Sequence, residues 1–145
     1  MLDLTDLTPD LRVRVDALIA IANSEGISVV KTSGLRTFAE QADLYRAYRE
    51  GRHKYPAAAP GLSRHHGYWS GLTAAVDLSP VDADPDTIEH QKDRLGILAR
   101  DIALVWGGDW KTPDRVHFEL PGLDPWTRFT PLCTAIDAFL KALSP

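Results

Sequence analysis

Two titratable residues stand inside apolar runs that are typical of buried strands. Asp77 is the only charged residue in Ala74–Leu78, and His117 lies between Val116 and Phe118. An unpaired charge on a buried strand is costly, so each side chain is expected to be paired or to bind a metal ion. Taken alone, Asp77 could instead serve a turn or a helix cap, and His117 could be a hydrogen-bonded core histidine. Together, the two point to a metal centre.

The other reactive side chains indicate which metal such a centre would hold. A catalytic zinc ion usually has three protein ligands from His, Asp or Glu and keeps a fourth position for water. The segment Ser63-Arg64-His65-His66 supplies further histidines. Cys133 is the only cysteine, so a thiolate cluster is excluded, and its apolar surroundings favour a buried structural residue. The sequence therefore predicts a zinc site of two histidines and one aspartate.

Two more residues could take part in hydrolysis. Asp114 lies three residues before His117, a spacing that would place a carboxylate beside the metal, where it could accept a proton from the attacking water. Asp114 could also be a turn residue after Pro113. Arg36 follows Gly34-Leu35, and its planar guanidinium group suits a substrate carboxylate or carbonyl oxygen. An ordinary surface arginine is the alternative.

Helices are needed to position these side chains, and the sequence marks where they start and stop. Thr8-Pro9 predicts the first helix, with a hydroxyl to cap it and a proline whose φ is already helical. Gly26 is placed to end that helix. Thr37–Glu40 forms a capping box, which predicts a second helix over residues 38–50. Apolar residues recur at helical spacing in the first helix, at Leu11, Val15, Leu18, Ile19 and Ala22.

Strands and a long loop complete the expected domain. Asp84-Pro85 predicts a third helix, and Thr130-Pro131 a last one that reaches about Leu143. The stretch Arg52–Gly71 has no periodicity, and loops of this length are usually functional. Short strands are predicted over 27–31, 74–78 and 116–120. We expect an α+β fold in one domain, residues 1–145, with a short antiparallel sheet, flanking helices and a zinc cleft.

Composition excludes several classes of partner. A chain of 145 residues fits one domain. Its net charge of −4 argues against nucleic-acid binding, which needs a surplus of basic residues. No run approaches the roughly 18 apolar residues of a membrane span. The N-terminal residues 1–6 are acidic rather than basic, unlike a secretory signal. We expect a monomer that is made in the cytoplasm and is not inserted into a membrane.

Three segments occur in an order that resembles a known family. They are Ser33-Gly34-Leu35-Arg36 with Glu40-Gln41, Ser63-Arg64-His65 with Ala75-Val76-Asp77, and Gly107-Gly108-Asp109-Trp110 with Asp114-Arg115-Val116-His117. They resemble the hallmarks of the zinc D-alanyl-D-alanine carboxypeptidases and L-alanyl-D-glutamate endopeptidases. That family includes vancomycin-resistance carboxypeptidases and many phage endolysins. The resemblance spans about residues 33–120.

The resemblance implies a role for each matching residue. Zn²⁺ would be bound by His65, Asp77 and His117. Asp114 would be the general base, and Arg36 would stabilise the oxyanion that forms at the scissile carbonyl.

The same resemblance implies a pocket for the substrate peptide. Ser63, Trp106 and Trp110 would line or brace it. Asp109 and Glu119 are expected to be structural.

The chain departs from the family pattern between the first two ligands. Thr73 stands where relatives have glycine, and the span from His65 to Asp77 contains extra residues. The first ligand is therefore either His65 or His66, and the Ser-x-His spacing favours His65. The extra Tyr68-Trp69 could form a lip that alters which peptide fits.

The expected activity is zinc-dependent hydrolysis of a peptide bond in the stem peptides of bacterial peptidoglycan. An endolysin-type L-alanyl-D-glutamate endopeptidase fits a small chain made in the cytoplasm that acts on the cell wall after release. A D-alanyl-D-alanine carboxypeptidase is the alternative within the family. A metal-binding but inactive wall-binding or phage structural module is the alternative outside enzymes.

Overall fold

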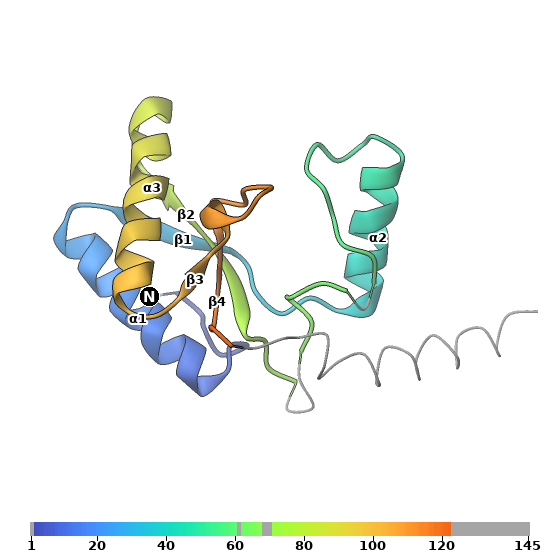
Figure 1. Ribbon diagram of the computed structural model, residues 1–145, viewed down its shortest axis with the longest axis horizontal. Coiled ribbons are helices and arrows are strands. Elements are labelled where there is room, and N and C mark those ends of the chain that lie inside the picture. Colours follow the sequence, from blue (N-terminus) through green and yellow to red (C-terminus); the bar gives the residue numbers. More distant parts are fainter. Residues whose placement is uncertain (1, 61, 68–70, 123–145) are drawn as a thin grey trace, which may run out of the picture.

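The structure is a computed structural model that describes residues 2–60, 62–67 and 71–122. Within these residues a small sheet is combined with helices, as the sequence predicted (Figure 1). The helices are α1 (Pro9–Ser24), α2 (Phe38–Arg49) and α3 (Pro85–Asp101), with a short 3-10 helix η1 (Gly107–Asp109). The strands are β1 (Ser28–Ser33), β2 (Ala75–Val81), β3 (Val105–Trp106) and β4 (His117–Glu119).

The helix starts follow the sequence signals with one exception. Thr37 Oγ1 accepts a hydrogen bond of 3.1 Å from Glu40 N, and Glu40 Oε2 accepts one of 2.8 Å from Thr37 N, so the capping box is confirmed. Asp84 caps α3 with a single bond of this kind, its Oδ1 accepting from Thr87 N over 3.0 Å. Thr8 was expected to cap α1 with its hydroxyl, and this was wrong. Its side chain makes no capping bond, so α1 starts on the fixed φ of Pro9 alone.

The four strands form one antiparallel sheet in the order β1-β2-β4-β3. The central strand β2 was predicted to stop at Leu78, but it continues to Val81. Pro80 lies opposite Val29 of β1. Proline cannot donate to a neighbouring strand, and it is tolerated here because β4 pairs with β2 only along Ala75–Asp77.

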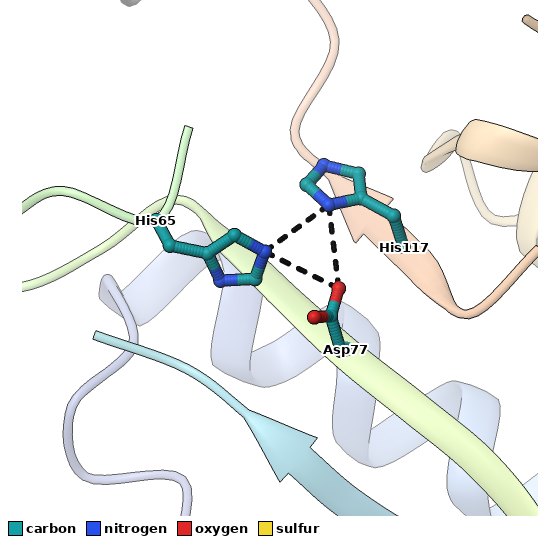
Figure 2. Close-up of side chains that lie close together, drawn as sticks. All are labelled: His65, Asp77 and His117. Atoms are coloured by element: carbon teal, nitrogen blue, oxygen red, sulfur yellow. Dashed lines mark hydrogen bonds and ion pairs between the residues drawn. The ribbon is translucent and has the colours of Figure 1, made fainter. Parts of the chain in front are cut away.

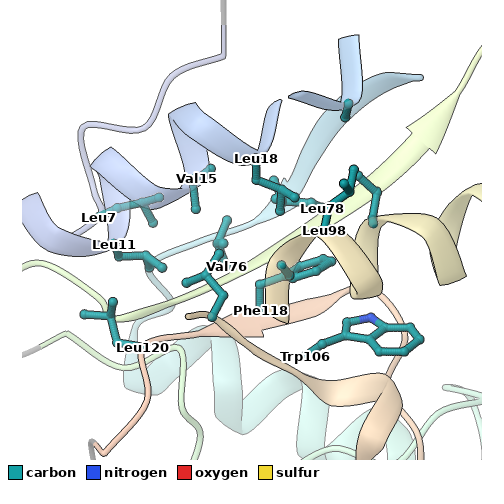
Figure 3. Packing of buried hydrophobic residues seen from close by; sticks show 14 of the residues in the cluster. Leu7, Leu11, Val15, Leu18, Val76, Leu78, Leu98, Trp106, Phe118 and Leu120 are labelled. Atoms are coloured by element: carbon teal, nitrogen blue, oxygen red, sulfur yellow. The ribbon is translucent and has the colours of Figure 1, made fainter. Parts of the chain in front are cut away.

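One face of the sheet carries the hydrophobic core (Figure 3). Val76 and Leu78 of β2 and Phe118 of β4 are fully buried and pack against helices α1 and α3. The expected apolar face of α1 is confirmed by its buried residues Leu11, Val15, Leu18 and Ala22. Burial of each such side chain contributes about 1.5–3 kcal/mol, so this layer fixes the position of β2 and β4.

The helix α2 stands apart from this core, on the other side of the sheet (Figure 1). Its only buried residue is the polar Gln41. Its aromatic residues Tyr45 and Tyr48 are not core residues, since Tyr48 is exposed and Tyr45 half-buried. The capping box, rather than deep burial, defines where α2 begins.

The α+β expectation is confirmed. The predicted last helix and Cys133 lie outside the described residues, and the extent of a single domain over residues 1–145 stays a prediction. Within the described part of the chain, no helix has both the length and the apolarity needed to cross a bilayer.

Candidate metal centre

The pleat of β2 and β4 separates the core from a polar cluster. Side chains alternate between the two faces of a strand, so Val76 and Phe118 point to the core while Asp77, His117 and Glu119 share the opposite face. Asp77 and His117 are direct partners in the β2–β4 register. Directly opposite residues have Cβ atoms about 5 Å apart, which brings the carboxylate to the imidazole.

The third residue of the cluster, His65, comes from the loop before β2. Its backbone is tied to the segment that follows β1, because Arg36 N donates to the carbonyl oxygen of His65 over 2.8 Å. Nδ1 of His65 donates to the carbonyl oxygen of Gly34 over 2.8 Å. These two bonds fix both the backbone and the ring of His65, so the loop presents Nε2 to the sheet.

The three side chains converge on one point (Figure 2). His65 Nε2 lies 3.2 Å from Asp77 Oδ1 and 3.2 Å from His117 Nδ1. His117 Nδ1 lies 3.3 Å from Asp77 Oδ1. Both histidines are buried, and the side chain of Asp77 is 15% exposed. The structure therefore brings together the three residues that the sequence proposed as metal ligands.

The hydrogen bonds around the cluster leave three lone pairs facing one another. His65 Nδ1 donates to Gly34, and His117 Nε2 donates to Glu119 Oε2 over 2.9 Å. In the neutral rings, the nitrogens that face Asp77 are then acceptors. Asp77 Oδ1 is buried, and both facing ring nitrogens lie within 3.3 Å of it. Three acceptors at this spacing repel one another unless a proton or a metal ion lies between them, and the two imidazoles and the carboxylate are ligands that suit a metal ion such as zinc.

The pKa values of the cluster reflect the same need for positive charge. Burial alone would lower the pKa of His117, but Asp77 and Glu119 raise it to about 9. Burial alone would raise the pKa of Asp77, yet the two facing histidines hold it well below its usual range. In the metal-free protein a proton on His117 therefore offsets the charge of Asp77, and a bound metal ion would replace that proton.

Asp114 is positioned by the turn before β4. Its backbone N donates to Gly107 O over 2.9 Å, and its carbonyl oxygen accepts from His117 N over 3.2 Å. A Cβ atom at Gly107 would overlap Asp114 O, so the turn needs a glycine there. The residue remains exposed, but desolvation of its carboxyl group and the charge of Asp77 raise the pKa of Asp114 above its usual value. Asp114 thus interacts electrostatically with the cluster.

Arg36 is held by a hydrogen-bonded frame. Nη1 donates to Gln41 Oε1 and Nη2 donates to Ser33 Oγ, both over 2.8 Å. Gln41 Nε2 in turn donates to the carbonyl oxygen of Ala58 over 2.5 Å. Arg36 is partly buried rather than a free surface side chain, and its backbone is bonded to His65.

The residues expected around a substrate pocket have different surroundings. Ser63 Oγ accepts from His65 N over 3.2 Å, so Ser63 shapes the ligand loop. The ring of Trp110 lies 4.9 Å from that of His117. Trp106 is a core residue, 6% exposed, and its Nε1 donates to Arg115 O over 2.9 Å. Its placement supports a bracing role behind the turn rather than contact with a substrate.

The structure also separates the two adjacent histidines. His66 stacks on Phe38 with ring centroids 4.4 Å apart, and its Nδ1 donates to Arg36 O over 3.0 Å. The cluster with Asp77 and His117 contains His65 and not His66. The suggested lip, Tyr68-Trp69, lies outside the described residues.

Sequence reasoning did not assign two residues that hold this centre together. Glu119, expected to be structural, forms a hydrogen bond with the ring of His117. Gln41 carries no signal beyond its Glu-Gln motif, yet it is buried and orients Arg36. One signal for Glu119 was available in the sequence: it lies two residues after His117, and residues two apart on a strand share one face of the sheet.

Comparisons with known proteins identify the family of the chain. The VanY family model, described as D-alanyl-D-alanine carboxypeptidase, matches residues 5–98, a range that contains His65 and Asp77 and ends before His117. The peptidoglycan L-alanyl-D-glutamate endopeptidase CwlK of Bacillus subtilis (strain 168) is 35% identical over 124 residues. The match covers 80% of this chain and 74% of CwlK.

Solved structures share the fold at lower identity. The L-Ala D-Glu endopeptidase ChiX of Serratia marcescens has a TM-score of 0.57 at 24% identity, covering 81% of this chain and 83% of ChiX. A vancomycin resistance D,D-pentapeptidase VanY in complex with Zn(II) has a TM-score of 0.60 at 18% identity. The match covers 80% of this chain and 73% of that VanY chain. Taken with the family match and the identity to CwlK, the chain belongs to the VanY D-alanyl-D-alanine carboxypeptidase family, a family of zinc peptidases acting on peptidoglycan.

Proposed function

We propose that this chain is an L-alanyl-D-glutamate endopeptidase that cuts the stem peptides of peptidoglycan, with zinc bound by His65, Asp77 and His117. The observation that carries the metal assignment is the set of three facing acceptor atoms 3.2–3.3 Å apart. The complex of the related-fold VanY with Zn(II) supports the choice of metal. The identity to CwlK supports the choice of bond.

The chain's own residues would divide the work of hydrolysis. Zinc in such a site supplies Lewis acidity, which polarises a peptide carbonyl and activates water near neutral pH. The carboxylate of Asp114 accepts the proton of the attacking water and returns it to the leaving amine. Arg36 faces the developing negative charge on the carbonyl oxygen with a guanidinium group already held by Ser33 and Gln41.

A D-alanyl-D-alanine carboxypeptidase is the second candidate, favoured by the description of the matching family model. The two activities release different products. Purified peptidoglycan digested with the zinc-loaded protein should yield fragments with a new N-terminal D-glutamate and no free D-alanine. Release of free D-alanine as the main product would replace the endopeptidase assignment by the carboxypeptidase one.

The proposal includes the endolysin role, in which the protein is made in the cytoplasm and reaches the wall after release. Production in the bacterial cytoplasm should leave cells intact until the membrane is permeabilised, and lysis should then be rapid. An Asp114→Asn variant is the control for lysis caused by permeabilisation itself. Equal lysis with both proteins would contradict the endolysin role.

A further inference from the structure

Glu119 uses both of its carboxylate oxygens beside the candidate metal centre. Oε2 accepts from His117 Nε2 over 2.9 Å, and Oε1 accepts from Arg64 Nη1 over 2.6 Å. Glu119 is 7% exposed. A buried carboxylate needs a partner for its charge, and here the guanidinium group of Arg64 supplies the opposite charge while His117 supplies a second hydrogen bond.

Arg64 links the two ligand-bearing segments. It directly precedes His65 in the loop, while Glu119 lies two residues after His117 on β4. Its side chain is 34% exposed, and its guanidinium carbon lies 5.6 Å from the centre of the Trp110 ring. The Trp110 ring is also 4.9 Å from the ring of His117. Arg64 is therefore held between the indole and the carboxylate.

The orientation of Glu119 decides which nitrogen of His117 is available to a metal ion. A histidine ring can bind through either nitrogen, and the hydrogen bond at one fixes the lone pair at the other. A carboxylate only accepts, so it keeps the proton of His117 on Nε2 and leaves Nδ1 free to face Asp77. Arg64 can only donate hydrogen bonds, so it favours an oxygen atom of residue 119 on its own side.

We propose that Arg64 and Glu119 act together as positioning residues: Glu119 selects the ring form of His117 that offers Nδ1, and Arg64 fixes the side chain of Glu119. This inference rests on the proposed zinc function. If the Arg64–Glu119 ion pair were merely structural, breaking it would lower stability. Zinc affinity would then not depend on whether residue 119 accepts a hydrogen bond from His117.

The isosteric variant Glu119→Gln tests the atom-level claim. Arg64 would attract the amide oxygen, so the NH₂ group would point at His117 and donate to Nε2. The ring would then carry its remaining proton on Nδ1, the atom that has to bind zinc. Removal of Arg64 in the same chain, as Arg64→Met/Glu119→Gln, would let the amide turn and present its oxygen to His117.

The measurement is the zinc dissociation constant of the folded protein, by competition with a chromogenic chelator, for the wild type and four variants. The variants are Glu119→Gln, Arg64→Met, the double variant, and Arg94→Met as control. Arg94 pairs with Glu25 away from the centre, with a side chain 44% exposed. Circular dichroism confirms folding, and the visible spectrum of the Co²⁺ form reports the geometry of the ligands.

Glu119→Gln should raise the zinc dissociation constant about 10–100-fold, the usual effect of losing such an outer partner. Arg64→Met should raise it less, Arg94→Met should not change it, and the double variant should bind zinc more tightly than Glu119→Gln alone. Zinc binding by Glu119→Gln within about twofold of the wild type would overturn the inference. So would a double variant that binds more weakly than Glu119→Gln. If the wild type itself binds no zinc, the proposed function fails instead.

Discussion

The carbonyl oxygen of Gly34 accepts a 2.8 Å hydrogen bond from Nδ1 of His65, a residue 31 positions later in the chain. The neighbouring Leu35 N donates to Asp6 Oδ2 over 2.8 Å, and Asp6 Oδ1 pairs with Lys31. The segment before α1 therefore supports the loop that orients a candidate zinc ligand. This arrangement extends the metal centre to residues near the N-terminus that carry no catalytic group.

Gly34→Ala tests this support. An added Cβ would overlap Asp6 Oδ2, so the loop has to move and the bond to His65 should weaken. We expect a lower melting temperature and weaker zinc binding. The change should cost much less in an Asp6→Ala chain, because the clash is then removed. An equal loss in both backgrounds, measured by thermal unfolding and zinc titration, would show that Asp6 does not restrict this loop.

Asp114→Asn should separate metal binding from catalysis. The side chain is not one of the three facing ligands, so about one zinc ion per chain should remain bound. Loss of the general base should reduce kcat/KM by about 10²–10⁴-fold. Hydrolysis of purified wall peptide by equal amounts of zinc-loaded wild type and variant measures this. A rate equal to that of the wild type would remove Asp114 from the mechanism.

Zinc affinity should depend on pH well above neutrality. The pKa of His117 is raised to about 9 by Asp77 and Glu119, against the effect of burial. A metal ion has to displace that proton, so affinity should rise about tenfold per pH unit up to about pH 9. With a histidine of ordinary pKa, zinc affinity would stop rising with pH above about pH 6.5. Zinc titrations between pH 6 and 10 distinguish the two, and a plateau from pH 7 would contradict the raised pKa.

The same proton also links the stability of the metal-free protein to pH. The folded-state pKa of His117 lies above the ordinary value near 6.5. Its contribution to stability is therefore fully present below about pH 6.5 and disappears as the pH rises through about 9. Glu119→Gln should lower the folded-state pKa of His117, because one of the groups that raise it is lost. The stabilisation should then disappear at a lower pH than in the wild type. Urea unfolding of the metal-free protein at several pH values measures it.

The two tryptophans of the late motif should respond differently to substitution. Trp106→Phe removes the donor to Arg115 O in the core and should destabilise the fold by about 1–3 kcal/mol, with little change in kcat/KM. Trp110→Ala removes a ring beside His117 and should lower kcat/KM with little loss of stability. Thermal unfolding and peptide hydrolysis, measured on both variants, test the contrast. The reverse pattern would place Trp106 at the substrate.

Local signals explain why much of the fold could be predicted. The capping box of Thr37 and Glu40, and the prolines Pro9 and Pro85, act within a few residues of their own position, so they mark helix starts without knowledge of the fold. Asp77 stood out because a single carboxylate in an apolar strand has few structural explanations. These features predicted the fold class and singled out Asp77, whereas the full set of metal ligands came from the resemblance to the family.

Long-range features were not predictable in this way. The extension of β2 through Pro80 depends on which neighbour pairs along each edge of the strand. The choice between His65 and His66 depends on the partners that the fold brings to each ring, Gly34 for one and Phe38 for the other. The role of Glu119 depends on Arg64, 55 positions away. None of these partners can be read from neighbouring residues.

Bound zinc per chain is the most direct test of the central claim that His65, Asp77 and His117 form a zinc site. Elemental analysis should be made on the wild type and on His65→Ala, His66→Ala, Asp77→Ala and His117→Ala, each checked for folding. We expect about one zinc ion in the wild type and in His66→Ala, and its loss in the other three variants. A folded wild type that holds no zinc and takes up none on addition would contradict the account, as would loss of zinc in His66→Ala with retention in His65→Ala.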